Sequence, residues 1–137
     1  MHEKKVKGDI GVAKVIAEAT SQLWNVLLPL SEHQQYDLVL EKDGELKRVQ
    51  VRYTSINKFG TISVKLRTSW ADKNGTHNRS REKNDYDILA VYCPGTEKVY
   101  FIDAANFNNT AAINLRVSEA KSGQRIGIRM ADDYLIL

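Results

Sequence analysis

The chain has 137 residues, of which 42% are hydrophobic and 27% are charged, and its formal net charge is +3. This length suits one domain with one core, and the composition is close to that of ordinary globular proteins, which excludes a fibrous or largely disordered chain. A single cysteine, Cys93, excludes an internal disulfide and a multi-cysteine zinc site. No apolar run reaches the length of a membrane span, and the N-terminus lacks a signal-peptide apolar region, so we expect a cytoplasmic protein without a membrane partner.

The predicted elements begin with an amphipathic helix over residues 9–22, because apolar residues recur there at intervals of three and four. Asp9 is its expected cap. A short buried strand follows at 24–28, and Pro29 ends it. Two further strands are predicted at 36–40 and 48–55, and the Asp-Gly step at 43–44 indicates that a tight turn joins them.

The second half of the chain continues the sheet. Residues 61–67 alternate polar and apolar side chains, as a strand with one solvated face does, whereas 69–85 form a long polar stretch that predicts a loop. Later elements are strands at 87–92 and 98–102, a short helix starting at 103–105, and short strands or turns at 111–117 and 125–129. The apolar run at 134–137 either forms an interface or closes the core. This order predicts an α/β domain whose mixed central sheet is flanked by helices.

Polar side chains with metal-binding chemistry gather on the two strands of the predicted hairpin. Asp37 supplies a carboxylate, and because side chains alternate along a strand, Gln50 and Arg52 share one face while Val49 and Val51 point to the core. Carboxylate, amide and main-chain carbonyl oxygens are ligands of hard ions such as Mg²⁺, which polarises a phosphodiester and lowers the pKa of an attacking water. We therefore expect a metal site at Asp37, Gln50 and the Val51 carbonyl. Taken alone, these residues also fit an ordinary solvated strand face.

Several segments together resemble the PD-(D/E)XK endonucleases associated with bacterial group I introns. They are Lys7-Gly8-Asp9-Ile10-Gly11, Leu28-Pro29-Leu30-Ser31-Glu32, Tyr36-Asp37-Leu38, Arg48-Val49-Gln50-Val51-Arg52-Tyr53-Thr54 and Tyr86-Asp87-Ile88-Leu89-Ala90-Val91-Tyr92-Cys93. The resemblance implies a restriction-endonuclease-like core, Mg²⁺-dependent cleavage of both strands of a long DNA target, and a homo-tetramer of small subunits. Mn²⁺ and Ca²⁺ are further ions that such a site would hold.

The resemblance also implies a role for each site position. Asp37 matches the metal-binding aspartate, and Gln50 falls at the second acidic position, where the family is similar in using glutamine. Two positions depart from the pattern: Arg52 replaces the family's lysine, and Val12 replaces a glutamate carried by the first helix. A guanidinium stabilises an anionic transition state but stays protonated and cannot act as a base. Losing the carboxylate should weaken metal binding. The carboxylates that would replace it are Asp9, Glu18 and Glu32.

A basic region at about 61–85 is the candidate DNA-contacting surface. A strand with alternating cationic and hydroxyl side chains fits the major groove as part of a β-ribbon, and arginine reads guanine there through two hydrogen bonds. A solvated charged loop is the ordinary alternative. The candidate contacts are Lys65, Arg67, Lys73, His77, Arg79, Arg81 and Lys83.

These observations predict one nuclease domain over 1–137, a site-specific double-stranded DNA endonuclease of the homing type whose activity is impaired by Val12 and Arg52. One alternative is a catalytically inactive DNA-binding protein of the same fold, and another is a structure-specific DNA junction resolvase. All nuclease interpretations require the side chains of Asp37 and Gln50 to lie on the same face of the sheet. Opposite faces, or a large distance between the carboxylate oxygen of Asp37 and the amide oxygen of Gln50, would end them.

Overall fold

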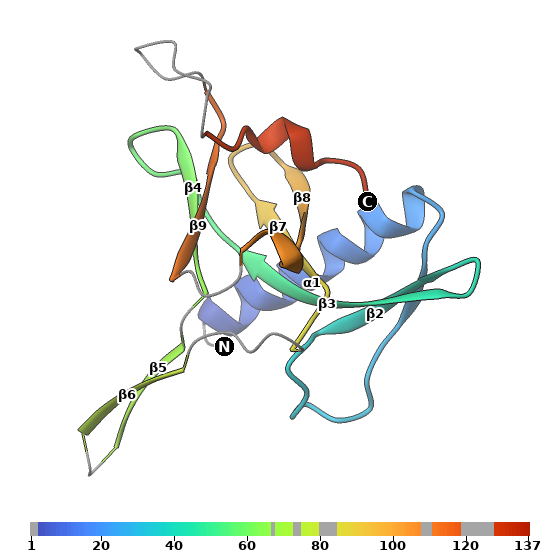
Figure 1. Ribbon diagram of the computed structural model, residues 1–137, viewed down its shortest axis with the longest axis horizontal. Coiled ribbons are helices and arrows are strands. Elements are labelled where there is room, and N and C mark those ends of the chain that lie inside the picture. The colour runs from blue at the N-terminus through green and yellow to red at the C-terminus, as the bar shows by residue number, and fades with distance from the viewer. Residues whose placement is uncertain (1–2, 67, 73–74, 80–84, 108–110, 119–127) are drawn as a thin grey trace.

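A computed structural model describes residues 3–66, 68–72, 75–79, 85–107, 111–118 and 128–137, and of 68–72 and 75–79 it describes the backbone alone. Within these residues, one α-helix packs on one face of a five-stranded mixed sheet (Figure 1). A two-stranded ribbon, rather than a second helix, covers the other face. The predicted α/β class with a restriction-endonuclease-like core is confirmed.

Helix α1 (Glu3–Ser21) begins well before the predicted start at residue 9. Asp9 is an exposed residue inside the helix and is not its cap. An ion pair of 3.0 Å between Lys7 Nζ and Glu3 Oε1 links the first two turns, and such pairs at i,i+4 stabilise a helix end that apolar periodicity does not mark. The buried residues of the helix are Gly11, Val15 and Ala19.

The central sheet has the order β1-β2-β3-β7-β8. Its strands are β1 (Asn25–Leu27), β2 (Leu38–Lys42), β3 (Glu45–Tyr53), β7 (Ile88–Cys93) and β8 (Lys98–Asp103). Strands β3 and β7 are parallel, and the other neighbours are antiparallel. The predicted hairpin of β2 and β3 is confirmed, and Asp43 (φ 52°) and Gly44 (φ 85°) have the positive φ values that its tight turn requires. The predicted buried strand at 24–28 is wrong in burial, because β1 is an edge strand with two exposed residues.

Two hydrophobic layers lie on the two faces of this sheet, and β7, which is buried at every residue, contributes to both. On the helix side, Ile88, Ala90 and Tyr92 pack with Val49, Val51 and the buried face of α1. On the ribbon side, Leu89, Val91 and Cys93 pack with the ribbon. Cys93 is therefore a buried free thiol inside this core.

The ribbon consists of β4 (Thr61–Lys65) and β9 (Ala112–Arg116), which pair antiparallel. Its inner face is apolar, with Ile62, Val64, Ile113 and Leu115 all buried. The predicted loop at 69–85 is wrong in part, because β5 (Thr68–Asp72) and β6 (Gly75–Arg79) pair as an antiparallel hairpin that projects from the body of the molecule (Figure 1). The Asn-Gly step at 74–75 was the available signal for this hairpin.

The C-terminal tail closes the core, which was one of its two predicted roles. Short 3₁₀ turns η1 (Ala104–Asn106) and η2 (Ala131–Tyr134) precede it, whereas residues 125–127 of the predicted element at 125–129 lie outside the described residues. Gln22 holds the tail through its amide: Nε2 donates to the carbonyl of Leu135 at 2.9 Å, and Oε1 accepts from the N–H of Leu137 at 2.8 Å. In the described part of the chain, no helix has the length and apolar character needed to span a bilayer.

Candidate active site

Asp37 immediately precedes β2, at the point where β3 extends beyond its neighbour. Its main-chain N–H donates to the carbonyl of Val49 at 2.8 Å, and its side-chain Oδ2 accepts from the N–H of Val51 at 2.7 Å. The carboxylate thus accepts the hydrogen bond that a longer β2 would have accepted from β3. Because the N–H and C=O of one residue in an antiparallel strand point to the same side, the carbonyl of Val51 faces the same edge as the carboxylate. Among the described residues, Oδ1 of Asp37 accepts no hydrogen bond, so one carboxylate oxygen is left for a cation.

Gln50 lies between the two β3 residues that Asp37 contacts. The ladder of β2 and β3 ends at the pair Leu38–Val49, and the hydrogen bonds of Asp37 to Val49 and Val51 set it beside Gln50 at the edge of β3. Gln50 is paired with Leu89, which lies in the ribbon-side core, so its side chain projects from the ribbon side of the sheet. That the oxygens of Asp37 and Gln50 meet at one cation stays a prediction.

Arg52 lies beside the proposed ligand oxygen. It pairs with Val91 and so shares the face of Gln50, and its side chain is half-buried. Its Nη1 donates to the carbonyl oxygen of Val51 at 3.3 Å. A fixed positive charge therefore sits against one of the oxygens that we expect a metal ion to use.

Val12 packs on the other side of the sheet. Its half-buried side chain lies against the helix-side core, as its helical spacing predicts. Helix α1 comes close to β3 here, because a Cβ atom on Gly11 would stand 3.3 Å from Cγ1 of Val51. The structure therefore brings position 12 next to β3, with an apolar side chain where the family pattern has a carboxylate.

The predicted substitutes for the missing carboxylate do not form a cluster. Oε2 of Glu18 already accepts hydrogen bonds from Ser21 Oγ at 2.8 Å and Gln22 Nε2 at 3.3 Å. Asp9 and Glu32 are exposed. In the part of the chain that is described, no three His, Cys, Asp or Glu side chains come together to hold a metal ion. The site therefore rests on one formal negative charge and neutral oxygens.

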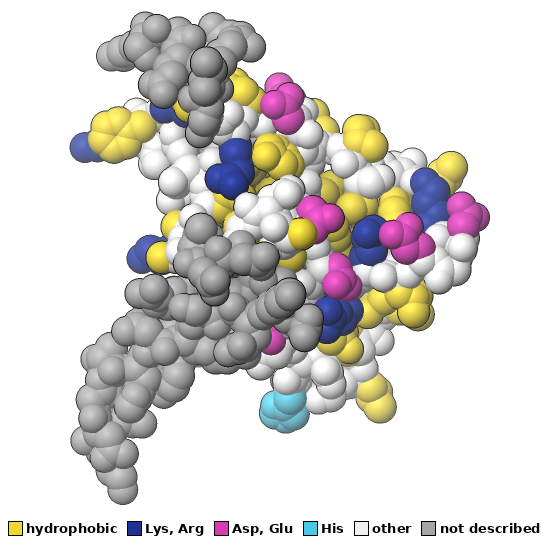
Figure 2. Space-filling view, viewed as in Figure 1, with side chains coloured by type: hydrophobic (Ala, Val, Ile, Leu, Met, Phe, Trp, Pro, Cys, Tyr) yellow, Lys and Arg dark blue, Asp and Glu magenta, His cyan; other side chains and the backbone are white. Residues whose placement is uncertain are grey.

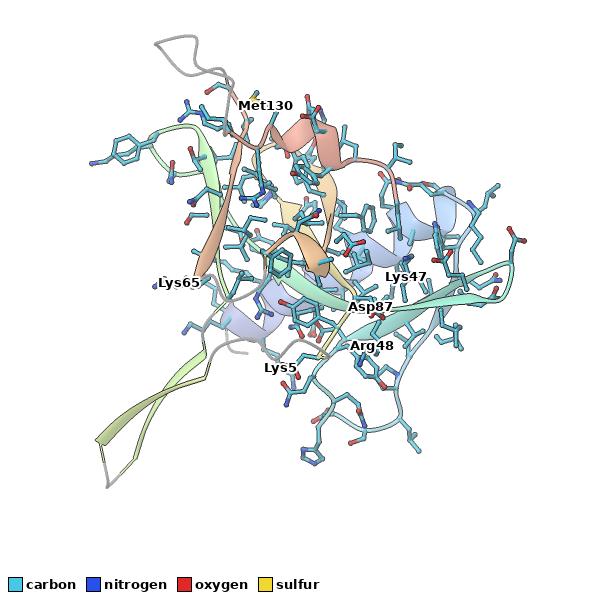
Figure 3. All side chains as sticks on the ribbon, in the orientation of Figure 1. Lys5, Lys47, Arg48, Lys65, Asp87 and Met130 are labelled. Carbon is cyan, nitrogen blue, oxygen red and sulfur yellow. The ribbon has the colours of Figure 1, made fainter. Side chains whose placement is uncertain are left out.

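A second aspartate, Asp87, caps β3 from its opposite edge, and the sequence analysis did not assign it a role. Its Oδ2 accepts from the N–H of Arg48 at 2.8 Å and from Nε at 3.2 Å, while Oδ1 accepts from Nη2 at 3.2 Å (Figure 3). Burial raises the pKa of Asp87, but the hydrogen bonds and charge of Arg48 outweigh it and hold that pKa below its ordinary value. The hydrogen bond to Asp87 raises the pKa of Arg48 in turn.

The sequence did carry a signal for this second cap. Tyr-Asp followed by an aliphatic residue occurs at 36–38 and again at 86–88, each time at the start of a strand that flanks β3. Both aspartates bond a main-chain N–H of β3, but both oxygens of Asp87 are taken up by Arg48. Asp87 is therefore a structural cap, whereas Asp37 keeps an oxygen available.

The candidate DNA contacts are described unequally. Lys65 is exposed at the end of β4. His77 and Arg79 belong to β6, of which the backbone alone is described. The remaining candidates, Arg67, Lys73, Arg81 and Lys83, lie outside the described residues.

Residues 1–137 match the sequence model of a family described as PD-(D/E)XK endonuclease. The chain belongs to the PD-(D/E)XK endonuclease family. A solved structure described as that of a bacterial homing endonuclease, I-Ssp6803I, is similar with a TM-score of 0.78 and 26% sequence identity, and the match covers 97% of this chain and 88% of that one. A comparison with curated proteins found no match. The resemblance stated from the sequence is thus confirmed, and PD-(D/E)XK endonucleases are DNA-cleaving enzymes that generally use divalent metal ions.

Proposed function

We propose that this PD-(D/E)XK endonuclease is a site-specific nuclease of the homing type that hydrolyses both strands of a duplex DNA target with Mg²⁺. Its site is Asp37, Gln50, the main-chain carbonyl of Val51, and Arg52. The observation that carries the proposal is the hydrogen bond of 2.7 Å from Val51 N–H to Asp37 Oδ2, because it sets a carboxylate and a main-chain carbonyl on one open strand edge. The similarity to a solved homing endonuclease supports the homing type.

The donor set suits a hard divalent ion. Oδ1 of Asp37, the amide oxygen of Gln50 and the carbonyl of Val51 are all oxygen ligands, which Mg²⁺ prefers and which Mn²⁺ and Ca²⁺ also accept. When bound, such an ion polarises the phosphodiester and lowers the pKa of an attacking water. In the chain itself, Asp37 holds the open edge of β3 in place, and Arg52 supplies positive charge against the negative charge that develops on the phosphate.

Two features of the site account for the proposed impairment of cleavage. Position 12 contributes an apolar contact instead of a second carboxylate, and metal affinity depends on the charge and number of ligands. Arg52 Nη1 already donates to the Val51 carbonyl at 3.3 Å, so a metal ion would have to displace or share that contact. The same two features favour the second candidate, a DNA-binding protein of this fold without turnover.

A plasmid cleavage assay separates these candidates. The substrate is a supercoiled plasmid carrying the uninterrupted form of the sequence in which the gene of this protein is inserted, incubated with Mg²⁺ or with EDTA. Linear or nicked product in Mg²⁺, its absence in EDTA, and its absence with Asp37→Asn are the expected results. Site-specific binding with no product at any Mg²⁺ concentration would replace the nuclease with the inactive binding protein. Cleavage of a four-way junction but not of duplex would indicate a resolvase.

A homo-tetramer is the assembly that we propose on the same family resemblance. The surface formed by β1, the loop that follows it and the start of β3 supplies apolar area for subunit contacts, because leucines there are exposed. They are Leu27 (47% exposed), Leu28 (64%), Leu30 (104%) and Leu46 (61%). Light scattering after gel filtration measures the mass directly, and a monomer at micromolar concentration would contradict the tetramer.

A further inference from the structure

A pocket lies along the ribbon, and its two arginines stand at the end far from Lys65. Its volume is about 390 Å³, and it is lined by Thr61, Ala112, Asn114, Arg116, Ile128 and Arg129. In the ribbon, Thr61 pairs with Arg116 and Lys65 pairs with Ala112. Arg116 and Lys65 therefore lie at opposite ends of the outer face of the ribbon. None of these lining residues belongs to the proposed metal site.

The two arginines are brought together by the main chain. The N–H of Arg116 donates to the carbonyl of Arg129 at 2.8 Å, and Arg116 forms a parallel bridge with Met130, which Figure 3 labels beside the ribbon. The segment 128–130 thus runs along the free edge of β9. Two residues that are distant from β4 in sequence therefore meet Thr61 in one pocket.

Both guanidinium groups keep their charge uncompensated among the described residues. Arg116 Nε donates to the carbonyl of Ser118 at 3.1 Å, and Arg129 Nη2 donates to the carbonyl of Asn106 at 3.1 Å. These acceptors are neutral and orient each group without cancelling its charge. A guanidinium has five N–H donors, so donors remain on both arginines.

No carboxylate is among the described residues that line this pocket. Along the left edge of the molecule in Figure 2, where β4 and β9 lie, Lys and Arg side chains are visible and Asp and Glu are not. Two guanidiniums around one pocket repel each other, and an anion between them removes that repulsion. Their planar forks match the oxygens of a phosphate.

We propose that this pocket binds a backbone phosphate of the DNA substrate through Arg116 and Arg129, as a contact separate from the metal site. The identity of the partner rests on the proposed function. Thr61 and Lys65 are four residues apart on one face of β4, which is about 14 Å, or about four base pairs of duplex. One DNA backbone lying along the ribbon therefore meets Lys65 at one end and the two arginines at the other.

The test is DNA affinity as a function of salt. Fluorescence anisotropy with a labelled duplex, in EDTA so that nothing is cleaved, compares the protein with the double variant Arg116→Gln and Arg129→Gln. Loss of two phosphate contacts lowers the slope of log K against log salt by about 1.8 and weakens binding about tenfold or more near 0.1 M salt. The loss should be the same for any duplex sequence, because phosphates carry no sequence information.

A matched control removes the same charge elsewhere. Lys14→Gln with Lys98→Gln neutralises a lysine on α1 and the lysine that begins β8, neither of which lines the pocket. An equal loss of affinity in this control would mean that net charge alone matters and would overturn the proposal. An unchanged salt slope in the arginine double variant would overturn it as well. Arg116→Lys with Arg129→Lys should restore most of the slope, which separates a charge effect from misfolding.

Two further measurements identify the ligand and separate the proposal for this pocket from the proposed nuclease function. Titration with inorganic phosphate, followed by NMR of the arginine Nε–H groups, shows whether the pocket takes free phosphate; a response there with no change in DNA binding would overturn the assignment to DNA. Cleavage at subsaturating DNA should fall in the arginine variant together with its affinity. If the protein cleaves nothing, the proposed function fails while the affinity result still decides the pocket.

Discussion

The carboxylate of Asp37 has two proposed roles, one structural and one in metal binding, and substitutions can separate them. Oδ2 accepts from the N–H of Val51 at 2.7 Å and thereby caps the edge of β3, whereas Oδ1 is the oxygen proposed to bind the metal ion. Asp37→Asn keeps a side-chain oxygen for the cap and removes the negative charge. Asp37→Ala removes both. The two variants therefore differ in stability but not in the expected loss of cleavage.

The size of the stability difference follows from the hydrogen bond. A bond to a charged acceptor contributes about 1.5–3 kcal/mol, and because Asp37 is half-buried, water can reach the freed N–H and reduce the loss to about 1–2 kcal/mol for Asp37→Ala. Asp37→Asn keeps a neutral bond and should lose about 0.5 kcal/mol. In a chain of this size 1 kcal/mol shifts Tm by about 4 °C, so Tm should fall by about 4–8 °C and about 2 °C respectively.

Calorimetry and the Mg²⁺-dependent nicking assay measure the two effects on the same protein samples. Both variants should lose nicking, while the alanine variant melts clearly below the asparagine variant. Nicking by Asp37→Asn at the level of the unmodified protein would show that the carboxylate is a structural cap alone. Equal melting temperatures for both variants would show that the bond to Val51 contributes nothing to stability.

Three further predictions concern other positions. The pKa of Asp87 is lowered in the folded state, so the stabilisation that this carboxylate contributes is present above its unfolded-state pKa of about 4 and is lost as pH falls through the lower folded value. Asp87→Asn should therefore reduce stability at pH 7 and flatten the dependence of the urea midpoint on pH below about 4. An unchanged pH profile would count against the ion pair between Asp87 and Arg48. Val12→Glu combined with Arg52→Lys should raise metal-dependent nicking above that of the unmodified protein, and no gain in either single or double variant removes the account of impairment. Gly8→Ala should raise the free energy of unfolding by about 1 kcal/mol in urea titrations, because Gly8 lies inside α1 and a Cβ there meets nothing within 4 Å.

Much of the core of this protein could be predicted from sequence, because the features concerned are local. A two-residue Asp-Gly turn needs positive φ at both positions, and that requirement identifies the β2–β3 hairpin without any distant contact. The alternation of side chains then assigns Val49 and Val51 to the core and Gln50 and Arg52 to the opposite face. The start of α1 was misplaced because Gly8 and Asp9 resemble a helix boundary, while the stabilising Glu3–Lys7 pair depends on the helix already being formed.

Contacts between distant segments were decided by the tertiary structure alone. The pairing of β2 with β3 begins at Leu38 and Val49, and β3 continues beyond it to Tyr53. The N–H and carbonyl of Val51 therefore lack a partner in β2 and are open to the carboxylate of Asp37 and to Arg52. The meeting of Arg116 and Arg129 likewise depends on a bridge beside β9 that no periodicity encodes. Residue patterns report the conformation of one segment at a time, whereas a site made at strand edges depends on where each neighbouring strand ends.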